Sequence, residues 1–309
     1  MRALVTGGAG FIGSALVDRL LAHLHRVEVV DNLSHGRRSN LARAEGSFRF
    51  SFHDADLRDP GAGRLISRLR PDVIFHLAAQ SDANASVIDP LGDAETNVLG
   101  GLRVLEAARH VGAKVVFASS GGAVHGGLLP GEPAAAEDAP QRPATPYGLA
   151  KRTMVDCLTL YQQLYGLEWA AVAPANVYGP RQDPTGEGGV VAIFAERLLT
   201  GAECVIYGQG TQTRDFVYVD DVVEAFLQAA EAGVGVYNIG TGVETSIVEL
   251  YELVATHCGV SAASRHAPPR LGDVERSVLD AAKARQQLGW TPRIGLAEGL
   301  DLTISSMRF

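Results

Sequence analysis

The chain of 309 residues has the length of one large or two modest domains, at roughly 150 residues per domain. Hydrophobic residues make up 46% and charged residues 20%, a composition that can bury a large core and excludes a disordered chain. With 27 basic and 35 acidic residues the net charge is −8, and an acidic surface repels nucleic acid and anionic lipid, so neither is an expected partner.

The three cysteines, Cys157, Cys204 and Cys258, lie far apart in the sequence. Their odd number and their spacing fit neither a disulfide framework nor a metal site, so free thiols in a reducing compartment are the simplest interpretation. The N-terminus lacks the long apolar core of a signal peptide, and no run of ~18 apolar residues occurs. These features predict a soluble, cytoplasmic protein without a metal or a membrane partner.

Short apolar segments alternate with helical patterns through the first half of the chain. In chain order, the expected elements are a strand at residues 3–6, a helix at 12–23, strands at 27–31 and 72–77, a helix at 94–110 and a strand at 113–118. Continuous apolar strands that alternate with helices are typical of an α/β fold, here a Rossmann-type, doubly wound parallel sheet.

The second half of the chain departs from this rhythm. Residues 126–146 contain five prolines and predict a surface loop, and a long helix follows at 146–165. Its apolar residues lie on more than one face, which predicts packing against both the sheet and a second subunit. The glycine- and proline-rich residues 174–189 then leave the sheet. We expect two interleaved domains, a sheet domain and a smaller C-terminal domain, formed by residues 1–173 with about 211–242 and by 174–210 with 243–309.

A glycine-rich turn, Gly7-Gly8-Ala9-Gly10-Phe11-Ile12-Gly13, joins the first strand to the first helix. Glycines at this place let backbone N–H groups approach a pyrophosphate at the helix N-terminus. Asp31 closes the second strand 18 residues after Gly13, near the distance expected for a carboxylate that holds the adenosine ribose. A carboxylate there repels a 2′-phosphate and favours NAD over NADP. Arg37 and Arg38 argue for NADP, but they follow the strand in a loop that we expect to be solvated.

Asp56 follows a further short segment and is a candidate for contact with the adenine amino group. The alternative interpretation is a helix cap before Pro60. In either interpretation the sheet domain is the nucleotide-binding domain, and the smaller domain is left to bind the substrate.

Tyr147 and Lys151 are spaced i, i+4 at the start of the long helix, so they point to one face. A free phenol has a pKa of ~10 and is a poor base at neutral pH. A nearby ammonium and the positive nicotinamide ring favour the phenolate and are expected to lower that pKa. Ser119 and Ser120 follow a parallel strand, and ligands bind outside the carboxyl ends of such strands.

Several segments, taken in order, resemble one family. They are Thr6–Ser14 (TGGAGFIGS), residues 30–34 (VDNLS), 75–80 (FHLAAQ), Asn97, 146–151 (PYGLAK), 175–184 (ANVYGPRQDP), 213–216 (TRDF), 219–222 (VDDV) and 238–242 (NIGTG). The chain resembles the extended short-chain dehydrogenases/reductases, and among them the UDP-glucose 4-epimerases (UDP-galactose 4-epimerases), over essentially its whole length.

The resemblance implies an NAD-dependent epimerase that forms a transient 4-keto sugar. Tyr147 would act as the base, with Lys151 and Ser120 as its catalytic partners. The implied cofactor-binding residues are Gly7, Gly10, Phe11, Ile12, Gly13, Asp31, Asn32, Asp56, Leu57, Leu77, Ala78, Ala79, Asn97, Ala118, Ser119, Tyr147, Lys151 and Pro174. The implied UDP-sugar-binding residues are Ser120, Asn176, Val190, Val205, Tyr207, Arg214, Arg270, Asp273 and Ser277.

Three positions depart from the family pattern. His125 stands where relatives have a tyrosine, and a tolerated substitution at the pocket rim is favoured over an added pH dependence. Ser81 replaces a lysine that some members place near the nicotinamide ribose. Ala173-Pro174 replaces an Arg-Tyr or Arg-Pro pair, which bears on some cofactor contacts.

Other activities of this superfamily remain as alternatives. A 4,6-dehydratase needs an acid–base pair after the active-site serine, where Gly121 and Gly122 stand, so dehydration is disfavoured. A UDP-glucuronate 4-epimerase or decarboxylase is the main rival, although its members tend to carry threonine in place of Asn176. A non-enzymatic NAD-sensing regulator is the remaining alternative. The family further implies a homodimer through a four-helix bundle, and a sugar pocket in which Ser277 leaves room for an N-acetyl group.

Overall fold

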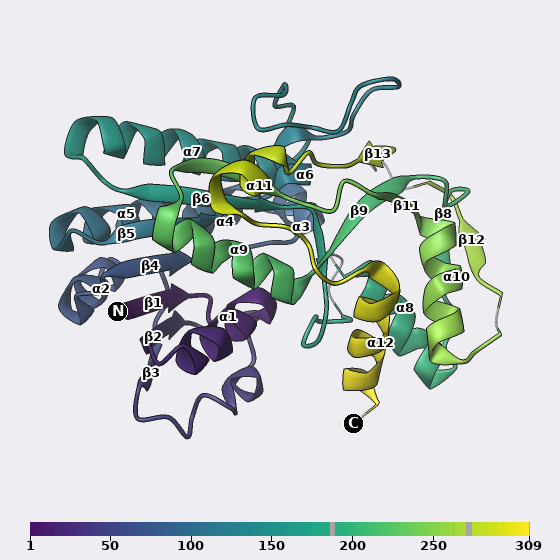
Figure 1. The fold of residues 1–309 in the computed structure, drawn as a ribbon, viewed down its shortest axis with the longest axis horizontal. Coiled ribbons are helices and arrows are strands. Elements are labelled where there is room, and N and C mark those ends of the chain that lie inside the picture. The colour runs from purple at the N-terminus through teal and green to yellow at the C-terminus, as the bar shows by residue number, and fades with distance from the viewer. Residues whose placement is uncertain (186–188, 262, 270–273, 309) are drawn as a thin grey trace.

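A seven-stranded parallel sheet forms the larger lobe of the molecule (Figure 1). The computed structural model describes residues 1–309 except 186–188, 262, 270–273 and 309. The strand order is β10-β6-β5-β4-β1-β2-β3, and every neighbouring pair is parallel. The strands are β1 (Arg2–Thr6), β2 (Arg26–Asp31), β3 (Phe50–Asp54), β4 (Val73–His76), β5 (Lys114–Ala118), β6 (Trp169–Pro174) and β10 (Gly235–Ile239). The prediction of a doubly wound parallel sheet is confirmed.

The order of strands reverses at β1, which lies between β2 and β4. Connections leave the two sides of this point in opposite directions, so a crevice opens at the carboxyl ends of β1 and β4. The glycine-rich turn follows β1, and residues 77–80 follow β4. The fold therefore brings two of the predicted cofactor-binding segments to one edge of the sheet.

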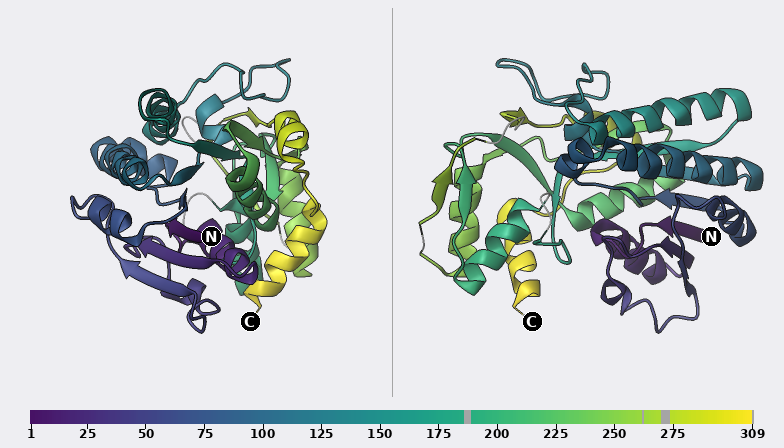
Figure 2. Two further views of the ribbon diagram at one scale, coloured as in Figure 1. Left: turned by 60° about the vertical axis from the view of Figure 1, so that its left-hand side comes forward. Right: turned by 180° about the vertical axis from the view of Figure 1, so that it is seen from behind.

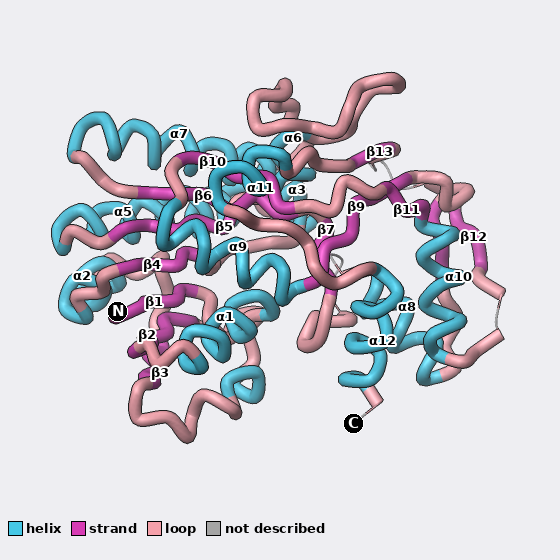
Figure 3. The backbone as a smooth tube through the Cα atoms, viewed as in Figure 1, coloured by secondary structure: helices cyan, strands magenta, loops and turns pink. Residues whose placement is uncertain are grey.

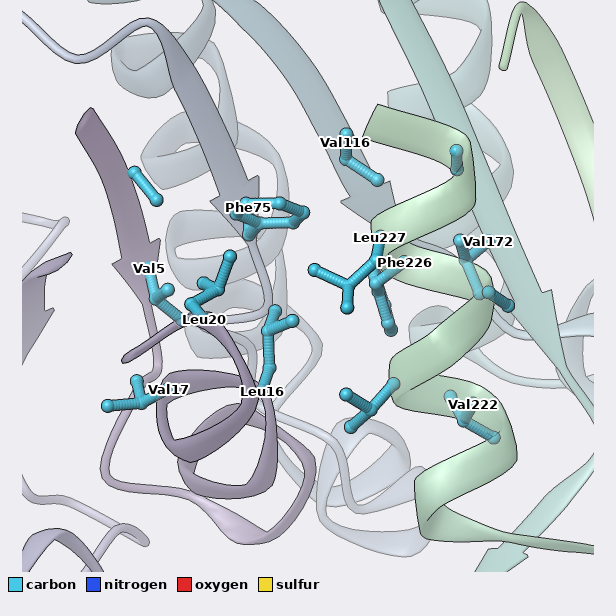
Figure 4. Close-up of a cluster of buried hydrophobic side chains, with 14 of the residues drawn as sticks. Val5, Leu16, Val17, Leu20, Phe75, Val116, Val172, Val222, Phe226 and Leu227 are labelled. Carbon is cyan, nitrogen blue, oxygen red and sulfur yellow. The ribbon is translucent and has the colours of Figure 1, made fainter. Parts of the chain in front are cut away.

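Helices cover both faces of this sheet. On one face α1 (Phe11–Ala22) and α9 (Val219–Ala232) bury a cluster that includes Val5, Leu16, Phe75, Val116 and Phe226 (Figure 4). On the other face the helices α2 (Ala62–Leu69), α5 (Gly100–Val111) and α7 (Pro146–Tyr165) bury a second cluster. The α1 face also takes up a late segment of the chain, because α11 (Ala282–Leu288) packs against α9 and β10.

A smaller lobe lies to one side of the sheet, as Figure 2 shows from two further directions. Its central strand β9 (Thr213–Tyr218) pairs with β7 (Asn176–Tyr178), β11 (Glu244–Ser246) and β13 (Arg276–Ser277). A second pair joins β8 (Val205–Tyr207) to β12 (Arg265–Ala267). The helices α8 (Val190–Thr200), α10 (Ile247–Cys258) and α12 (Leu296–Met307) close a third hydrophobic cluster around these strands.

The predicted division of the chain into two domains stays a prediction. The strand pairing shows how two of its segments are placed. β9 pairs with strands of the smaller lobe, although residues 211–242 were expected in the sheet domain. Trp290 belongs to the first cluster of the larger lobe, and its indole N–H donates to the carbonyl of Asp221 on α9 at 2.8 Å. The chain thus crosses between the lobes more often than the predicted boundaries allow.

Two helices predicted from the sequence can be compared with the structure. The helix predicted at 146–165 is α7, and the segment between α6 and α7 is largely loop (Figure 3). The helix predicted at 94–110 instead contains a π-helical turn, η2 (Glu95–Leu99), between α4 (Pro90–Ala94) and α5. Cys157, Cys204 and Cys258 are free thiols. No helix in the described ranges is long and apolar enough to span a membrane.

Candidate active site

Glycine is required at two positions of the turn between β1 and α1. Gly7 has φ +71°, and a Cβ added there would lie 2.6 Å from the backbone nitrogen of Ala78. A Cβ on Gly13 would lie 2.1 Å from the carbonyl oxygen of Gly7. The turn therefore packs against the segment after β4 and against the first turn of α1, with no space for side chains. The N–H groups that begin α1 at Phe11 and Ile12 stay available to an anion at this end of the helix.

Asp31 closes β2 and is only 8% exposed. Its carboxylate accepts the N–H of Ala9 at 2.9 Å and that of Leu33 at 2.8 Å. Asp31 therefore holds the glycine-rich turn in place from the neighbouring strand. The contact to Ala9 is a structural role that the sequence did not reveal.

Asn32 and Asp56 meet beside Asp31, as expected for two residues of one binding site. The Asn32 side-chain amide donates to Asp56 at 2.9 Å, and Arg58 forms an ion pair with Asp56 at 2.7 Å. The hydrogen bonds from Arg58 hold the pKa of Asp56 well below its ordinary value. The alternative interpretation of Asp56 as a helix cap is wrong, because α2 begins after Gly61. Next to Asp56, Leu57 is buried in the second cluster.

The two arginines that argued for NADP are paired with carboxylates elsewhere. Arg37 lies 3.3 Å from Asp183, and Arg38 lies 2.6 Å from Glu45. The Arg38 guanidinium also stacks on the ring of Phe52, with 3.9 Å to its centroid. These contacts engage both guanidinium groups with other partners, which favours the preference for NAD.

The segment after β4 is fixed by β1 and by η2. Leu77 donates its N–H to the carbonyl of Thr6 at 3.1 Å, and Ala78 donates to the Thr6 hydroxyl at 3.3 Å. Asn97 on η2 accepts the N–H of Gln80 at 3.0 Å and donates to its carbonyl at 2.9 Å. These bonds occupy the Asn97 amide, so Asn97 positions the loop that includes Ala79.

Tyr147 lies in the first turn of α7, which begins with a cap from the Thr145 side chain and with Pro146. The Tyr147 N–H donates to the Ser86 hydroxyl at 3.1 Å. One turn later, the Lys151 Nζ lies 5.6 Å from the centre of the Tyr147 ring and donates to the carbonyl of Ala118 at 2.8 Å. The structure therefore brings together the predicted pair and the end of β5.

Ser120 completes this group, because it forms a hydrogen bond with the Tyr147 hydroxyl. It follows β5 and caps α6 (Gly121–His125) by accepting the N–H of Ala123 at 3.4 Å. Ser119 is buried, and its N–H bonds to the carbonyl of Val172 in β6 at 2.8 Å. Pro174 ends that strand and is also buried.

Burial dominates the protonation of the pair. It raises the pKa of Tyr147 to about 12, opposed by the Ser120 hydrogen bond and aided by the charge of Asp93. Burial likewise lowers the pKa of Lys151 to about 8. In the protein alone, burial therefore holds the phenol pKa above its ordinary value, and the lowering expected from the ammonium together with the nicotinamide ring stays a prediction. At neutral pH this site therefore favours a neutral phenol beside an ammonium whose pKa burial has lowered.

The predicted substrate-binding residues come from several strands of the smaller lobe. Ser277 on β13 is paired with Arg214 on β9. Its hydroxyl lies 3.0 Å from the place a Cβ on Gly122 would take, two residues after Ser120. The structure thus places Ser277 close to Gly122, two residues after Ser120, and Arg214 opposite Ser277 on the neighbouring strand. The alternative interpretation of Ser277 as the start of a strand at 278–279 is wrong, because Ser277 ends β13.

The other residues assigned to substrate binding lie on β7, β8 and α8 of the smaller lobe. Asn176 begins β7, paired with Phe216 of β9. Val205 and Tyr207 are the ends of β8, and the Tyr207 carbonyl accepts a bond from Gln212 at 3.2 Å. Val190 begins α8 and is partly buried against the third cluster. Arg270 and Asp273 lie outside the described residues.

His125 was expected at the rim of the pocket, and the structure corrects this expectation. It is 5% exposed, and its Nδ1 has no hydrogen-bond partner among the described residues. Burial lowers its pKa, opposed by a bond to the carbonyl of Pro140. Ser81, in contrast, is exposed after β4.

Two buried carboxylates at the site escaped the sequence analysis. Asp215 on β9 accepts the N–H groups of Thr241 at 2.9 Å and of Gly242 at 3.1 Å, and so joins the smaller lobe to the loop after β10. Asp93 lies beside Asn97 and the catalytic pair. Asp215 stands in the segment TRDF without a role assigned to it, and Asp93 stands in no recognised segment, so only their tertiary contacts reveal what they do.

Fold and site together define a dinucleotide-binding protein with a serine–tyrosine–lysine centre at the carboxyl edge of its sheet. The chain belongs to the NAD dependent epimerase/dehydratase family, whose model matches residues 3–240.

Among characterised proteins, the chain is 52% identical to a UDP-glucose 4-epimerase of Mycolicibacterium smegmatis, over 100% of this chain and 99% of that one. A solved UDP-glucose 4-epimerase of Thermotoga maritima with UDP-glucose superposes with TM-score 0.94 at 44% identity, covering 100% and 99% of the two chains. A UDP-glucose 4-epimerase of Thermus thermophilus in complex with NAD gives TM-score 0.93 at 46% identity, with the same coverage.

Proposed function

We propose that this protein is an NAD-dependent 4-epimerase that interconverts UDP-glucose and UDP-galactose through a transient 4-keto sugar. The observation that carries the proposal is the Ser120–Tyr147–Lys151 group, with Ser277 of the smaller lobe close to Gly122 and Arg214 opposite Ser277 on the neighbouring strand. The similarity to UDP-glucose 4-epimerases over the whole chain supports it.

The residues present fit NAD. The turn at Gly7 and Gly13 has no room for a Cβ, which leaves backbone N–H groups close to a pyrophosphate. Asp31 lies at the end of β2, where a carboxylate meets the adenosine ribose. When bound, NAD supplies a reversible acceptor for the hydride on sugar C4.

The side chains of the site handle the proton that accompanies this transfer. Tyr147 takes the proton from the C4 hydroxyl, and Ser120 holds the same oxygen through its own hydroxyl. Lys151, anchored on the Ala118 carbonyl, stabilises the phenolate that Tyr147 must form. After the keto sugar turns about its phosphate link, Tyr147 returns the proton to the C4 oxygen while the hydride returns to C4 from the opposite face, which inverts the configuration of that carbon. Arg214 is suited to hold the diphosphate, because a guanidinium matches oxyanion geometry.

The shape of the site argues against dehydration. A Cβ on Gly121 would lie 2.4 Å from Cδ1 of Leu279, and one on Gly122 would lie 3.0 Å from the Ser277 hydroxyl. An acid–base pair at these two positions has no space unless the substrate lobe moves. The positions after Ser120 therefore favour a reaction that returns the hydride to C4 and the proton to the C4 oxygen.

Product analysis tests the proposal directly. Purified protein is incubated separately with UDP-glucose, UDP-galactose and UDP-glucuronate, and the products are separated by chromatography. Interconversion of the first two supports a hexose 4-epimerase. Conversion of UDP-glucuronate alone would replace it with a uronate epimerase or a decarboxylase, and the absence of any product would favour a regulator that binds NAD.

The protein is expected to purify with NAD and to bind NADP poorly. The physical reason is the carboxylate of Asp31, which repels a 2′-phosphate, while Arg38 is held by Glu45. Denaturing the protein and identifying the released nucleotide by mass spectrometry checks this result. Asp31→Asn should shift the preference toward NADP, and Asp59→Asn, which removes a nearby acid, serves as the control. Predominant NADP in the wild type would show that an arginine outweighs Asp31.

A homodimer through α5 and α7 is also expected, so light scattering should give twice 32.6 kDa, or about 65 kDa. The α7 helix and the turns beside it expose large apolar side chains, next to a hollow of about 460 Å³. These side chains are Leu91, Leu99, Leu149, Leu160, Leu164 and Tyr165. Burying them against a second copy forms a four-helix bundle.

Introducing negative charge among these exposed apolar side chains of α7 should separate the subunits. Leu160→Glu combined with Leu164→Glu is expected to give a monomer, whereas Leu302→Glu on α12, also an exposed leucine, should leave the dimer intact. A wild-type mass near 33 kDa at micromolar concentration would rule out the bundle.

Substitution of Ser277 by tyrosine is expected to abolish turnover of UDP-N-acetylglucosamine while UDP-glucose is still turned over. The Ser277 hydroxyl faces Gly122 beside the catalytic serine, so a tyrosine ring fills space that serine leaves open for an N-acetyl group. Steady-state assays of both sugars check this, with Ser277→Ala as the variant that keeps the space open. If the tyrosine variant retains turnover of UDP-N-acetylglucosamine, the residue that limits the size of the sugar is not Ser277.

A further inference from the structure

Asp93 is an acidic side chain that the proposed mechanism does not use. It lies in α4, which packs against the catalytic helix α7, and it is 2% exposed. It also lines the hollow beside α7 together with Pro146 and Ala150, the neighbours of Tyr147 and Lys151 in the sequence. A buried acid at this place requires partners, because isolated buried charge is costly.

Both partners of Asp93 are side-chain amides. Its Oδ1 accepts the Asn97 Nδ2–H at 2.9 Å and the Gln80 Nε2–H at 3.1 Å. Amide N–H groups donate and do not accept, so both bonds favour the ionised carboxylate. The same Asn97 amide holds the backbone of Gln80 on both sides. Burial raises the pKa of Asp93, and the two amide bonds oppose that shift because they favour the charged form. Asp93 therefore fixes the loop after β4 to η2, and its charged form places a negative charge there.

The charge of Asp93 acts on both members of the catalytic pair. It stabilises the Lys151 ammonium and disfavours the Tyr147 phenolate, so it raises the pKa of each group. Asp89, at the start of α4, is a second acid that faces Asp93. His76 lies near Lys151, but burial lowers its pKa to about 3, so it stays neutral in the working range.

We propose that Asp93 is a positioning residue for the Tyr147–Lys151 pair: it holds the loop after β4 through Asn97 and Gln80, and its charge sets the pH range in which the pair works. The proposal rests on the proposed function for its activity assay, but its spectroscopic test does not.

The direction of the effect follows from the signs. Without the negative charge of Asp93, the phenolate of Tyr147 forms at lower pH, and the ammonium of Lys151 is lost at lower pH. Both limbs of the pH–rate profile therefore move toward acid. A purely structural role lowers the rate or the stability but leaves the position of the profile unchanged.

Asp93→Asn is the variant that separates charge from shape, because the asparagine carbonyl still accepts the two amide bonds. One pH unit below the wild-type optimum, the variant should retain about two- to fivefold more of its own maximal rate than the wild type does. Glu95→Gln, an exposed change of the same charge two residues away, is the matched control and should leave the profile in place. A profile of Asp93→Asn that coincides with the wild type, or an equal shift in Glu95→Gln, overturns the proposal.

A second measurement is independent of turnover. The alkaline difference spectrum between the holoenzyme and its Tyr147→Phe variant reports the phenolate of Tyr147, and the same difference is recorded in the Asp93→Asn background. We expect the phenolate to appear at lower pH in that background, and no change in its midpoint overturns the proposal even if the sugar substrate is a different one. If Asp93→Asn does not fold, Asp93→Ser must give the same acid shift, and Asp93→Glu must keep the wild-type position.

Discussion

Replacement of Tyr147 by phenylalanine is expected to lower the turnover number by about 10²–10⁴-fold, the usual contribution of a positioned acid–base group. The dissociation constant of the UDP-sugar should change little, because the phenol moves a proton and does not hold the diphosphate. The change removes a single oxygen from the first turn of α7, and the backbone bond from Tyr147 to Ser86 is retained.

Initial rates and calorimetric binding of UDP-glucose measure the two quantities separately. Tyr165→Phe is the matched control, since Tyr165 ends the same helix and is 51% exposed. It should keep wild-type turnover. Unchanged turnover in Tyr147→Phe would remove Tyr147 as the base.

Loss of the Lys151 ammonium should slow turnover by roughly tenfold for each pH unit by which the acid limb moves, and move the optimum to higher pH. Lys151 is the positive charge beside a phenol whose pKa burial already raises to about 12. Removing that charge raises the phenol pKa further, so a given fraction of phenolate is reached only at higher pH. Lys151→Ala tests this, and Lys151→Met tests the same loss with less empty space beside Phe117.

The pH–rate profiles of these variants are compared with that of Arg152→Ala, which removes an exposed positive charge from the next position of the helix. That control should keep the wild-type optimum. A Lys151 variant whose optimum moves to lower pH would contradict the assigned role. The opposite directions expected for Lys151 and Asp93 variants make the two charges distinguishable in one set of experiments.

Local pattern was sufficient to predict much of the fold. Continuous apolar strands predicted the parallel sheet, and the proline and threonine before Tyr147 mark the start of α7. The i, i+4 spacing placed Tyr147 and Lys151 on one face. The π-helical turn at Glu95–Leu99 was missed because its residues keep a helical periodicity, and one extra residue in a turn leaves no mark in composition.

Tertiary contacts explain the rest of what the sequence missed. The phenol of Tyr147 was expected to be more acidic, because the charge of Lys151 is visible in the sequence whereas the burial of both groups is not. His125 looked like a rim residue until α6 placed it inside the fold. The contact of Ser277 with Gly122 joins residues from the two lobes, so no local pattern contains it.

Two segments from the later part of the chain, β10 and the region of Trp290, complete the larger lobe, and this order has a consequence for biosynthesis. The edge strand β10 enters the sheet after β9 has entered the other lobe, and Trp290 fills a core that begins with Ala3. A ribosome that has released only the first two hundred residues therefore exposes a sheet without one edge strand and without the indole that packs beside α9. The core around α9 is completed only once Trp290 has emerged, and until β10 pairs with it, β6 is an uncovered edge strand.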